Sequence, residues 1–299
     1  MAARLFLCAI RVIFCLFVFA KVGISDLNCG ISSSGIPPPS HDRIINGYNI
    51  SSGDHPWLVS LLYSKSNGTE IIAGFCGGTI LSDRWILTAA HCTDRDGLAG
   101  YRFFYGAVNY KDAEAKTVKI KRSINHPEFH RPKRNLDIAL AELSEPLTFN
   151  DKVQPICLVK KYKEVRHSMA VVIGWGSYSA SPGQGPPGLE TMPTIAQETN
   201  VPLANLEECL PNLRPAKKEY NICAGALNRG TEEGDSGSPL MVNKNGRWWQ
   251  IGAVSRGQYL GKDWHNVTGL TIYSRVTRAC QWIEETTSGE VKCHDMELH

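Results

Sequence analysis

Short apolar runs bounded by Gly, Pro or Asn recur along most of the chain, and they predict β-strands. The runs are rich in Val, Ile, Trp and Thr; clear examples are residues 57–63, 85–89, 170–175 and 248–254. This composition is typical of strands separated by tight turns. Many short strands without long helices fit an all-β fold of two antiparallel barrels.

One helical repeat occurs near the C-terminal end. Val276, Ala279, Cys280 and Ile283 follow one another at steps of three and four residues. This spacing places apolar side chains on one face of a helix. We therefore expect a short closing helix.

The first residues form a mainly apolar segment that predicts a secretory signal peptide. The run covers residues 5–20, Arg11 interrupts it, and the small residues Gly23 and Ser25 follow. About 16 residues are fewer than the ~20 that a membrane-spanning helix needs. We expect a signal peptide over residues 1–25 rather than a signal anchor.

Cysteine content and glycosylation tripeptides agree with secretion. Loss of residues 1–25 would leave eight of the ten cysteines, and an even number in a secreted chain predicts disulfides. Asn-Xaa-Ser/Thr acceptors occur at Asn49, Asn67 and Asn266. With 32 Lys and Arg against 29 Asp and Glu, the charge is too balanced to predict binding to nucleic acid or a membrane surface.

The segment Gly234-Asp235-Ser236-Gly237 has the features of a serine nucleophile on a tight turn. A serine hydroxyl needs a base to take its proton and N–H groups to hold the oxyanion that forms. Without a side chain, Gly234 can direct its amide, with that of Ser236, into one small hole. Alone, such a tetrapeptide is more often an ordinary glycine-rich turn.

Two other stretches supply the partners that this serine needs. His91 follows a small-residue apolar segment, and Asp137 lies inside an apolar run. Each has a simple structural interpretation, as a packed histidine or a capping aspartate. Together they give the order His91, Asp137, Ser236 with spacings of 46 and 99 residues, the chain order of chymotrypsin-type enzymes.

On these three blocks the sequence resembles the chymotrypsin/trypsin-like serine peptidase family from Cys29 to about Thr287. The resemblance implies two six-stranded antiparallel β-barrels with a short C-terminal helix and a catalytic cleft between the barrels. It implies peptide-bond hydrolysis through an acyl-enzyme, with neither cofactor nor metal. Ser236 would attack, His91 would transfer the proton, Asp137 would orient His91, and the amides of Gly234 and Ser236 would bind the oxyanion.

The resemblance extends to zymogen activation. Arg43-Ile44-Ile45-Asn46-Gly47 is similar to a family activation site, although Asn46 stands where Val or Gly is usual. Cleavage after Arg43 would free the amino group of Ile44 to pair with Asp235. We expect a signal peptide at 1–25, a propeptide at 26–43, a peptidase domain at 44–287 and a C-terminal tail at 288–299. His294 and Asp295 could suggest a metal site, but we expect the tail to be frayed and polar.

The resemblance also implies the disulfides. Family pairings carry over to Cys76–Cys92, Cys209–Cys223 and Cys29–Cys157, and they leave Cys280 and Cys293 for each other. Sequence alone does not fix the connectivity.

Several positions depart from the family pattern. Glu232 replaces the cysteine usual four residues before the nucleophile, and its partner after Ser255-Arg256-Gly257 is missing. The two cysteines of a second family disulfide are also absent, and Ala170 and Val242 stand at their positions. Arg256 replaces a tryptophan in the wall along which substrate backbone would pair with Ser255 to Gly257. Ser255 would also support Asp137.

The specificity pocket lacks its usual acid. Trypsins carry an aspartate six residues before the nucleophile, and this chain has Gly230, followed by Thr231. Thr271 falls where open pockets have glycine. A pocket without an acid favours apolar residues before the cut, so a chymotrypsin- or elastase-like preference ranks above a basic one. Glu232 and Glu233 could attract a basic side chain from the rim.

The implied partners are protein or peptide substrates, an activating protease, and serpin or Kunitz-type inhibitors, in the extracellular space. A catalytically silent homologue with a secreted binding or regulatory role is the alternative. Arg256 and the lost pocket disulfide favour this alternative. The three catalytic residues, Gly234 and the Arg43–Ile44 site favour the enzyme.

Overall fold

The computed structural model describes residues 27–33, 47–64, 71–94, 98, 100–130, 135–176, 193–210, 216–226, 229–257 and 269–298. The expected signal peptide, the Arg43–Ile44 site, Asn67 and Asn266 lie outside these residues. None of the helices in this part of the chain is long and apolar enough to cross a membrane.

The first barrel closes six antiparallel strands in the order β2-β3-β4-β7-β6-β5. Its strands are β2 (Leu58–Ser64), β3 (Ile71–Ile80), β4 (Trp85–Thr88), β5 (Tyr101–Tyr105), β6 (Lys116–Asn125) and β7 (Ala139–Leu143). Leu61, Phe103 and Val118 are cross-strand neighbours on β2, β5 and β6, and all three are buried. Because side chains alternate along a strand, this row fills the barrel interior.

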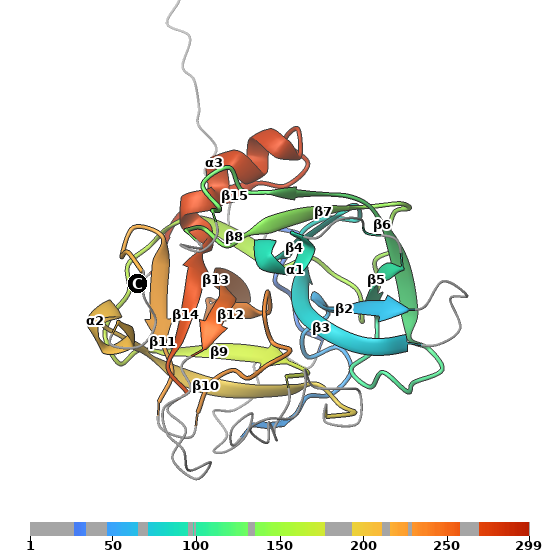
Figure 1. The fold of residues 1–299 in the computed structure, drawn as a ribbon, viewed down its shortest axis with the longest axis horizontal. Helices are drawn as coiled ribbons and strands as arrows, with labels where there is room; N and C mark the ends of the chain where they lie inside the picture. The colour runs from blue at the N-terminus through green and yellow to red at the C-terminus, as the bar shows by residue number, and fades with distance from the viewer. Residues whose placement is uncertain are drawn as a thin grey trace, which may run out of the picture.

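The second barrel also contains six antiparallel strands. They are β9 (Met169–Gly174), β10 (Gln197–Ala204), β11 (Asn221–Ala224), β12 (Pro239–Lys244), β13 (Arg247–Gly257) and β14 (Thr271–Arg275). The path β12-β9-β10-β11-β14-β13 is closed by pairing of β12 with β13. Val201 and Leu203 of β10 are buried, whereas Asn200 before them and Pro202 between them are less so. The two barrels lie side by side (Figure 1), which confirms the predicted fold.

Short elements extend the barrels. β1 (Tyr48–Asn49) pairs with β10, and β8 (Cys157–Tyr162) runs parallel to β13. The helices are α1 (Ala90–Thr93), α2 (Leu206–Cys209) and α3 (Val276–Thr286). Four residues of α3 are buried: Val276, Ala279, Cys280 and Ile283. They are the four that the helical repeat predicted to share a face.

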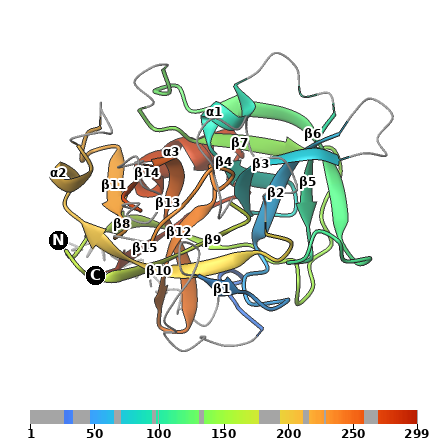
Figure 2. The same cartoon turned by 60° about the horizontal axis from the view of Figure 1, so that its bottom comes forward.

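The C-terminal segment is not a frayed tail, so that expectation was wrong. Cys293–Leu298 form strand β15, which pairs in parallel with β8; Figure 2 shows the two strands next to each other. Cys293 is bonded to Cys280 of α3, and the ring of His294 packs edge-on against Trp249. The edge of β8 offers backbone partners that the tail's own polar sequence does not reveal.

Four disulfides are present in the described residues: Cys29–Cys157, Cys76–Cys92, Cys209–Cys223 and Cys280–Cys293. These are the pairs that the family resemblance implies. Cys76–Cys92 joins β3 to α1, and Cys280–Cys293 joins α3 to β15. Each of these two disulfides therefore links elements that lie close together in the chain.

Candidate active site

Both barrels contribute side chains to the candidate site. His91 lies in α1, directly after β4, and Asp137 lies two residues before β7, both in the first barrel. Ser236 precedes β12 and Ser255 is in β13, both in the second barrel. The amide of Gly77 in β3 donates to the carbonyl of Ser236 at 2.7 Å, so the serine turn is tied to the opposite barrel.

Asp137 is fully buried and binds His91 through both carboxylate oxygens. Its Oδ2 lies 2.7 Å from His91 Nδ1, and its Oδ1 accepts the His91 backbone amide at 2.9 Å. The hydroxyl of Ser255 donates to Oδ2 at 2.7 Å. The carboxylate therefore fixes the imidazole orientation and requires a proton on Nδ1, which leaves Nε2 as an acceptor.

The electrostatics keep Asp137 ionised. Burial acts to raise the pKa of Asp137, but hydrogen bonds from His91 and Ser255, with the charge of His91, outweigh it and hold the pKa below its ordinary value. The preceding Leu136 is buried and has φ +38°. A leucine rarely adopts this left-handed conformation. The surrounding packing therefore holds the backbone that aims Asp137.

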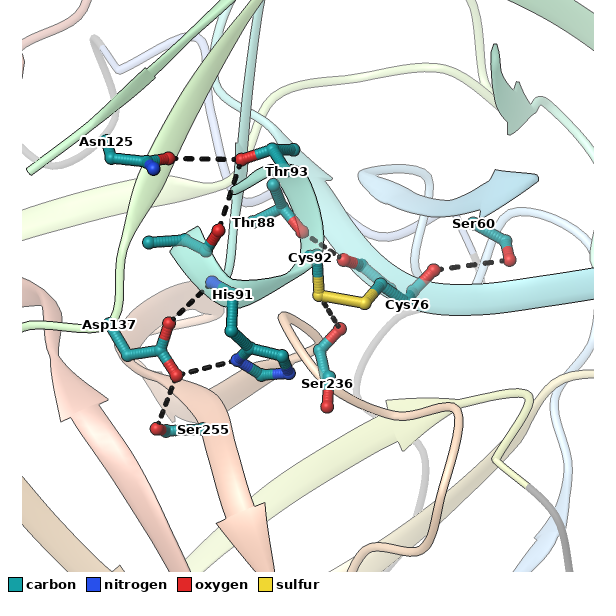
Figure 3. Close-up of a disulfide and its surroundings, with 12 residues drawn as sticks. Ser60, Cys76, Thr88, His91, Cys92, Thr93, Asn125, Asp137, Ser236 and Ser255 are labelled. Carbon is teal, nitrogen blue, oxygen red and sulfur yellow. Dashed lines mark hydrogen bonds and ion pairs between the residues drawn. A yellow bond between two sulfur atoms is a disulfide. The ribbon is translucent and has the colours of Figure 1, made fainter. Parts of the chain in front are cut away.

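Figure 3 shows the His91 imidazole lying between the Asp137 carboxylate and the side chain of Ser236. The side chain of His91 is 15% exposed, so solvent reaches it. The figure draws no hydrogen bond between His91 and Ser236. Such bonds are often long without substrate and shorten when substrate binds.

The backbone amides of Gly234 and Ser236 are the donors that the sequence predicts for an oxyanion. Gly234 and Gly237 have φ +103° and +87°, values that favour glycine. Among the described residues, neither the Gly234 amide nor the Ser236 amide donates to a protein acceptor. The neighbouring amide of Gly237 is bonded to Val254, so it is not available for this purpose.

Asp235 directly precedes Ser236 in the chain and is 1% exposed. It accepts the amide of Gly176 at 2.7 Å and the amide of Glu232 at 3.0 Å. Within the described residues it pairs with no cation, and burial raises its pKa to about 6. A countercharge here would remove the cost of burying a lone carboxylate.

The expected pocket residues lie close together. Thr231 and Thr271 are buried and their hydroxyls are 2.9 Å apart. Gly257, at the end of β13, faces both threonines, and Gly230 packs against the backbone of Gly269. Arg256 lies between Ser255 and Gly257 on β13 and is partly exposed.

Sequence reasoning missed several contributors to this site. Gly77 and Gly176 act through backbone amides, and a side chain at Gly176 would collide with Asp235, with its first carbon 2.2 Å from Oδ2. In the sequence, the Gly-Trp-Gly segment at 174–176 could have indicated that the backbone approaches another group closely here. The contributions of Leu136 and Gly77 depend on backbone geometry that leaves no motif.

One group of potential metal ligands occurs in the described residues, at Cys76, His91 and Cys92. Both cysteines are joined in a disulfide, and a disulfide sulfur is not the thiolate that binds metals. We therefore assign no metal to this group. Among the glycosylation acceptors, the described Asn49 is exposed.

Two antiparallel barrels that bring an aspartate, a histidine and a serine to one site define the chymotrypsin-like serine protease class. A family model described as Trypsin matches residues 44–283. The chain belongs to the trypsin family of serine proteases. It is 31% identical over 247 residues to vitamin K-dependent protein C of Rattus norvegicus, an alignment that covers 81% of this chain and 51% of that protein. The chain thus spans about half the length of this relative.

Proposed function

We propose that this protein is a secreted serine endopeptidase that hydrolyses peptide bonds through an acyl-enzyme on Ser236. The paired hydrogen bonds from His91 to Asp137 are the observation that carries the proposal. They hold the imidazole in the tautomer that a general base for Ser236 requires. Membership of the trypsin family supports the same chemistry.

The mechanism follows from the groups in the cleft. His91 Nε2 takes the proton of the Ser236 hydroxyl as its oxygen attacks the substrate carbonyl. Asp137 stabilises the imidazolium that forms, and the amides of Gly234 and Ser236 donate to the oxyanion. One such donor is worth roughly 3–4 kcal/mol in a comparable protease. His91 then protonates the leaving amine, and water releases the acyl group by the reverse sequence.

We propose that cleavage between Arg43 and Ile44 activates the protein. The buried Asp235 has two amide donors and no cation among the described residues. The ammonium group freed at Ile44 would supply the countercharge. Because a buried ion pair forms only with good geometry, its formation would fix the adjacent Ser236 turn and oxyanion amides.

The proposed organisation is a signal peptide at 1–25, a propeptide at 26–43 and a peptidase domain at 44–287, with β15 now packed onto that domain. The Cys29–Cys157 disulfide would keep the propeptide attached after cleavage. Four disulfides support an oxidising, extracellular location. Protein substrates, an activating protease, and serpin or Kunitz-type inhibitors are the proposed partners.

Arg256 and the lost pocket disulfide favour a second candidate, a catalytically silent binding protein. A fluorophosphonate separates the two functions, because it labels only an activated serine. We expect labelling of the chain cleaved at Arg43, little labelling of the uncleaved chain, and none of cleaved Ser236→Ala. A cleaved, folded wild-type protein that resists the reagent would establish the silent homologue.

A further inference from the structure

The hydroxyl of Ser238, two residues after the proposed nucleophile, is a buried polar group without a partner. Ser238 is fully buried, and its Oγ makes no hydrogen bond in the part of the chain that the structure describes. The backbone of the same residue is satisfied, because its amide donates to the Asp235 carbonyl and its carbonyl accepts the Val254 amide, each at 2.9 Å. An unpaired buried hydroxyl is costly, so the position of this one calls for a reason.

Glycines from both barrels enclose this hydroxyl. A side-chain carbon on Gly77 of β3 would lie 1.9 Å from Ser238 Oγ, and one on Gly174 of β9 would lie 3.1 Å from it. The Gly77 amide already donates to the Ser236 carbonyl, and the Gly77 carbonyl accepts the hydroxyl of Thr88. The backbone polar groups of Gly77 are therefore already in use.

The carboxylate of Asp235 meets the same face of Gly174. The side-chain carbon that Gly174 lacks would lie 2.1 Å from Asp235 Oδ1 and 3.1 Å from Ser238 Oγ. The two oxygens are therefore at most about 5.2 Å apart, a span that one nitrogen with two hydrogen bonds of about 2.8 Å can bridge. Among the described residues, Asp235 has amide donors but no cation, and Ser238 Oγ has no donor.

We propose that Ser238 is a positioning residue, whose hydroxyl oxygen accepts a hydrogen bond from the Ile44 ammonium group when that group pairs with Asp235. An ammonium group carries three N–H donors, so pairing with a carboxylate leaves donors that need a further acceptor in a buried place. Ser238 follows the Ser236 turn directly, so this bond would tie the freed chain end to the nucleophile. The inference rests on the proposed activation at Arg43 and adds a residue to it.

The pH at which the cleaved enzyme loses activity tests the inference. An α-amino group loses its proton at about pH 8, and each acceptor that binds its charged form raises that pKa. The active form is therefore present below the ordinary pKa and is lost as the pH rises through the raised one. Ser238→Ala removes one acceptor, so the alkaline midpoint of kcat/KM should fall by about one pH unit, which is tenfold in the equilibrium constant.

Other titratable groups near Asp235 are the same in every variant. Burial and then the charge of Asp235 raise the pKa of Glu232 to about 7, and the same two causes raise the pKa of Tyr273. The matched control is Ser274→Ala. The Ser274 hydroxyl is also buried without a partner in the described residues, but Ser274 lies on β14, outside the serine turn. Its removal should leave the alkaline midpoint unchanged.

A second measurement separates this role from a merely structural one. In the uncleaved chain protected by Arg43→Gln, Ile44 has no free amino group. Ser238→Ala should leave the urea midpoint of that chain unchanged or raise it, because the substitution removes an unpaired buried hydroxyl. A serine that only stabilises the fold would lower the urea midpoint of the cleaved and uncleaved chains alike.

The outcomes separate the two proposals. Fluorophosphonate labelling near neutral pH is measured on every cleaved variant, and Ser238→Gly replaces Ser238→Ala if the alanine variant does not fold. A labelled Ser238 variant with the wild-type alkaline midpoint, an equal shift in Ser274→Ala, or an equal loss of urea stability in both chains overturns the role of Ser238 and leaves the protease function standing. A cleaved wild-type chain that resists the reagent overturns the protease function, and the role of Ser238 with it.

Discussion

His91 donates to Asp137 twice, from its backbone amide at 2.9 Å and from its imidazole Nδ1 at 2.7 Å. A hydrogen bond from the ring alone would let the imidazole tilt about one axis. The second bond fixes the backbone of α1 relative to the same carboxylate. The aspartate therefore sets both the position of His91 and its tautomer.

Asp137→Asn should leave the protein folded and lower kcat by about 10⁴-fold, as in a comparable triad where the amide selects the wrong tautomer. The measurement is steady-state hydrolysis of an alanine peptide by the Arg43-cleaved variant, with thermal melting as the control for folding. A folded variant that retains more than a tenth of the activity would show that Asp137 does not position the base.

Ser255→Ala should lower kcat by about 10-fold, because a hydrogen bond to a charged group contributes roughly 1.5–3 kcal/mol. Ser255 contacts Asp137 rather than the reacting atoms, so we describe it as a positioning residue. KM for an alanine peptide should change little, and Ser255→Thr, which keeps the hydroxyl, should recover part of the rate. An increase in KM with unchanged kcat would assign Ser255 to substrate binding instead.

Asp235 makes the stability of the uncleaved chain depend on pH. Burial raises its pKa from 3.8 to about 6, so the folded chain holds this proton more tightly than the unfolded chain. Its contribution is complete below about pH 4 and is lost as the pH rises through about 6. In a chain protected by Arg43→Gln, Asp235→Asn should increase stability at pH 8 by on the order of 2 kcal/mol.

Urea unfolding between pH 4 and pH 8 measures this effect, with the Arg43→Gln chain as the reference. The same Asp235→Asn change should abolish activity in the chain cleaved at Arg43, because the Ile44 ammonium loses its partner. A substitution that destabilises the uncleaved chain equally at every pH would show that Asp235 is not a buried, uncompensated carboxyl.

The Cys280–Cys293 disulfide should stabilise the second barrel through β15. Replacing both cysteines with alanine should lower the free energy of unfolding by about 2–4 kcal/mol, the usual range for a disulfide. Activity per folded molecule should stay the same, because none of the candidate catalytic residues lies in α3 or β15. Urea unfolding and active-site titration test the two parts, and unchanged stability would mean that β15 is held by strand pairing alone.

The strand pattern and the closing helix were predictable because each depends on local apolar spacing. All but the last residue of the run 170–175 falls on β9, the run 248–254 falls on β13, and the four repeat positions of α3 are buried. Strand β15 was not predictable, because its stability comes from β8 and from Cys280, both distant in sequence. A polar segment becomes ordered when another element supplies hydrogen-bond partners for its backbone.

The candidate site was predictable where it depends on side chains with a fixed spacing. His91, Asp137, Ser236 and the supporting Ser255 were identified from the sequence, and the structure brings them together. The hydroxyl contact between Thr231 and Thr271 was not predictable, because it joins two residues that are 40 positions apart. The strained backbone at Leu136 left no pattern in the sequence.

Trapping of the acyl-enzyme tests the central claim most directly. The Arg43-cleaved chain is mixed with a nitrophenyl ester of acetyl-alanine, quenched within milliseconds and analysed by mass spectrometry. The account predicts a burst of one nitrophenol per active site and an acetyl-alanyl group attached to Ser236, with both absent in Ser236→Ala and strongly slowed in His91→Ala. Hydrolysis without an adduct, or an adduct that persists in Ser236→Ala, would contradict it.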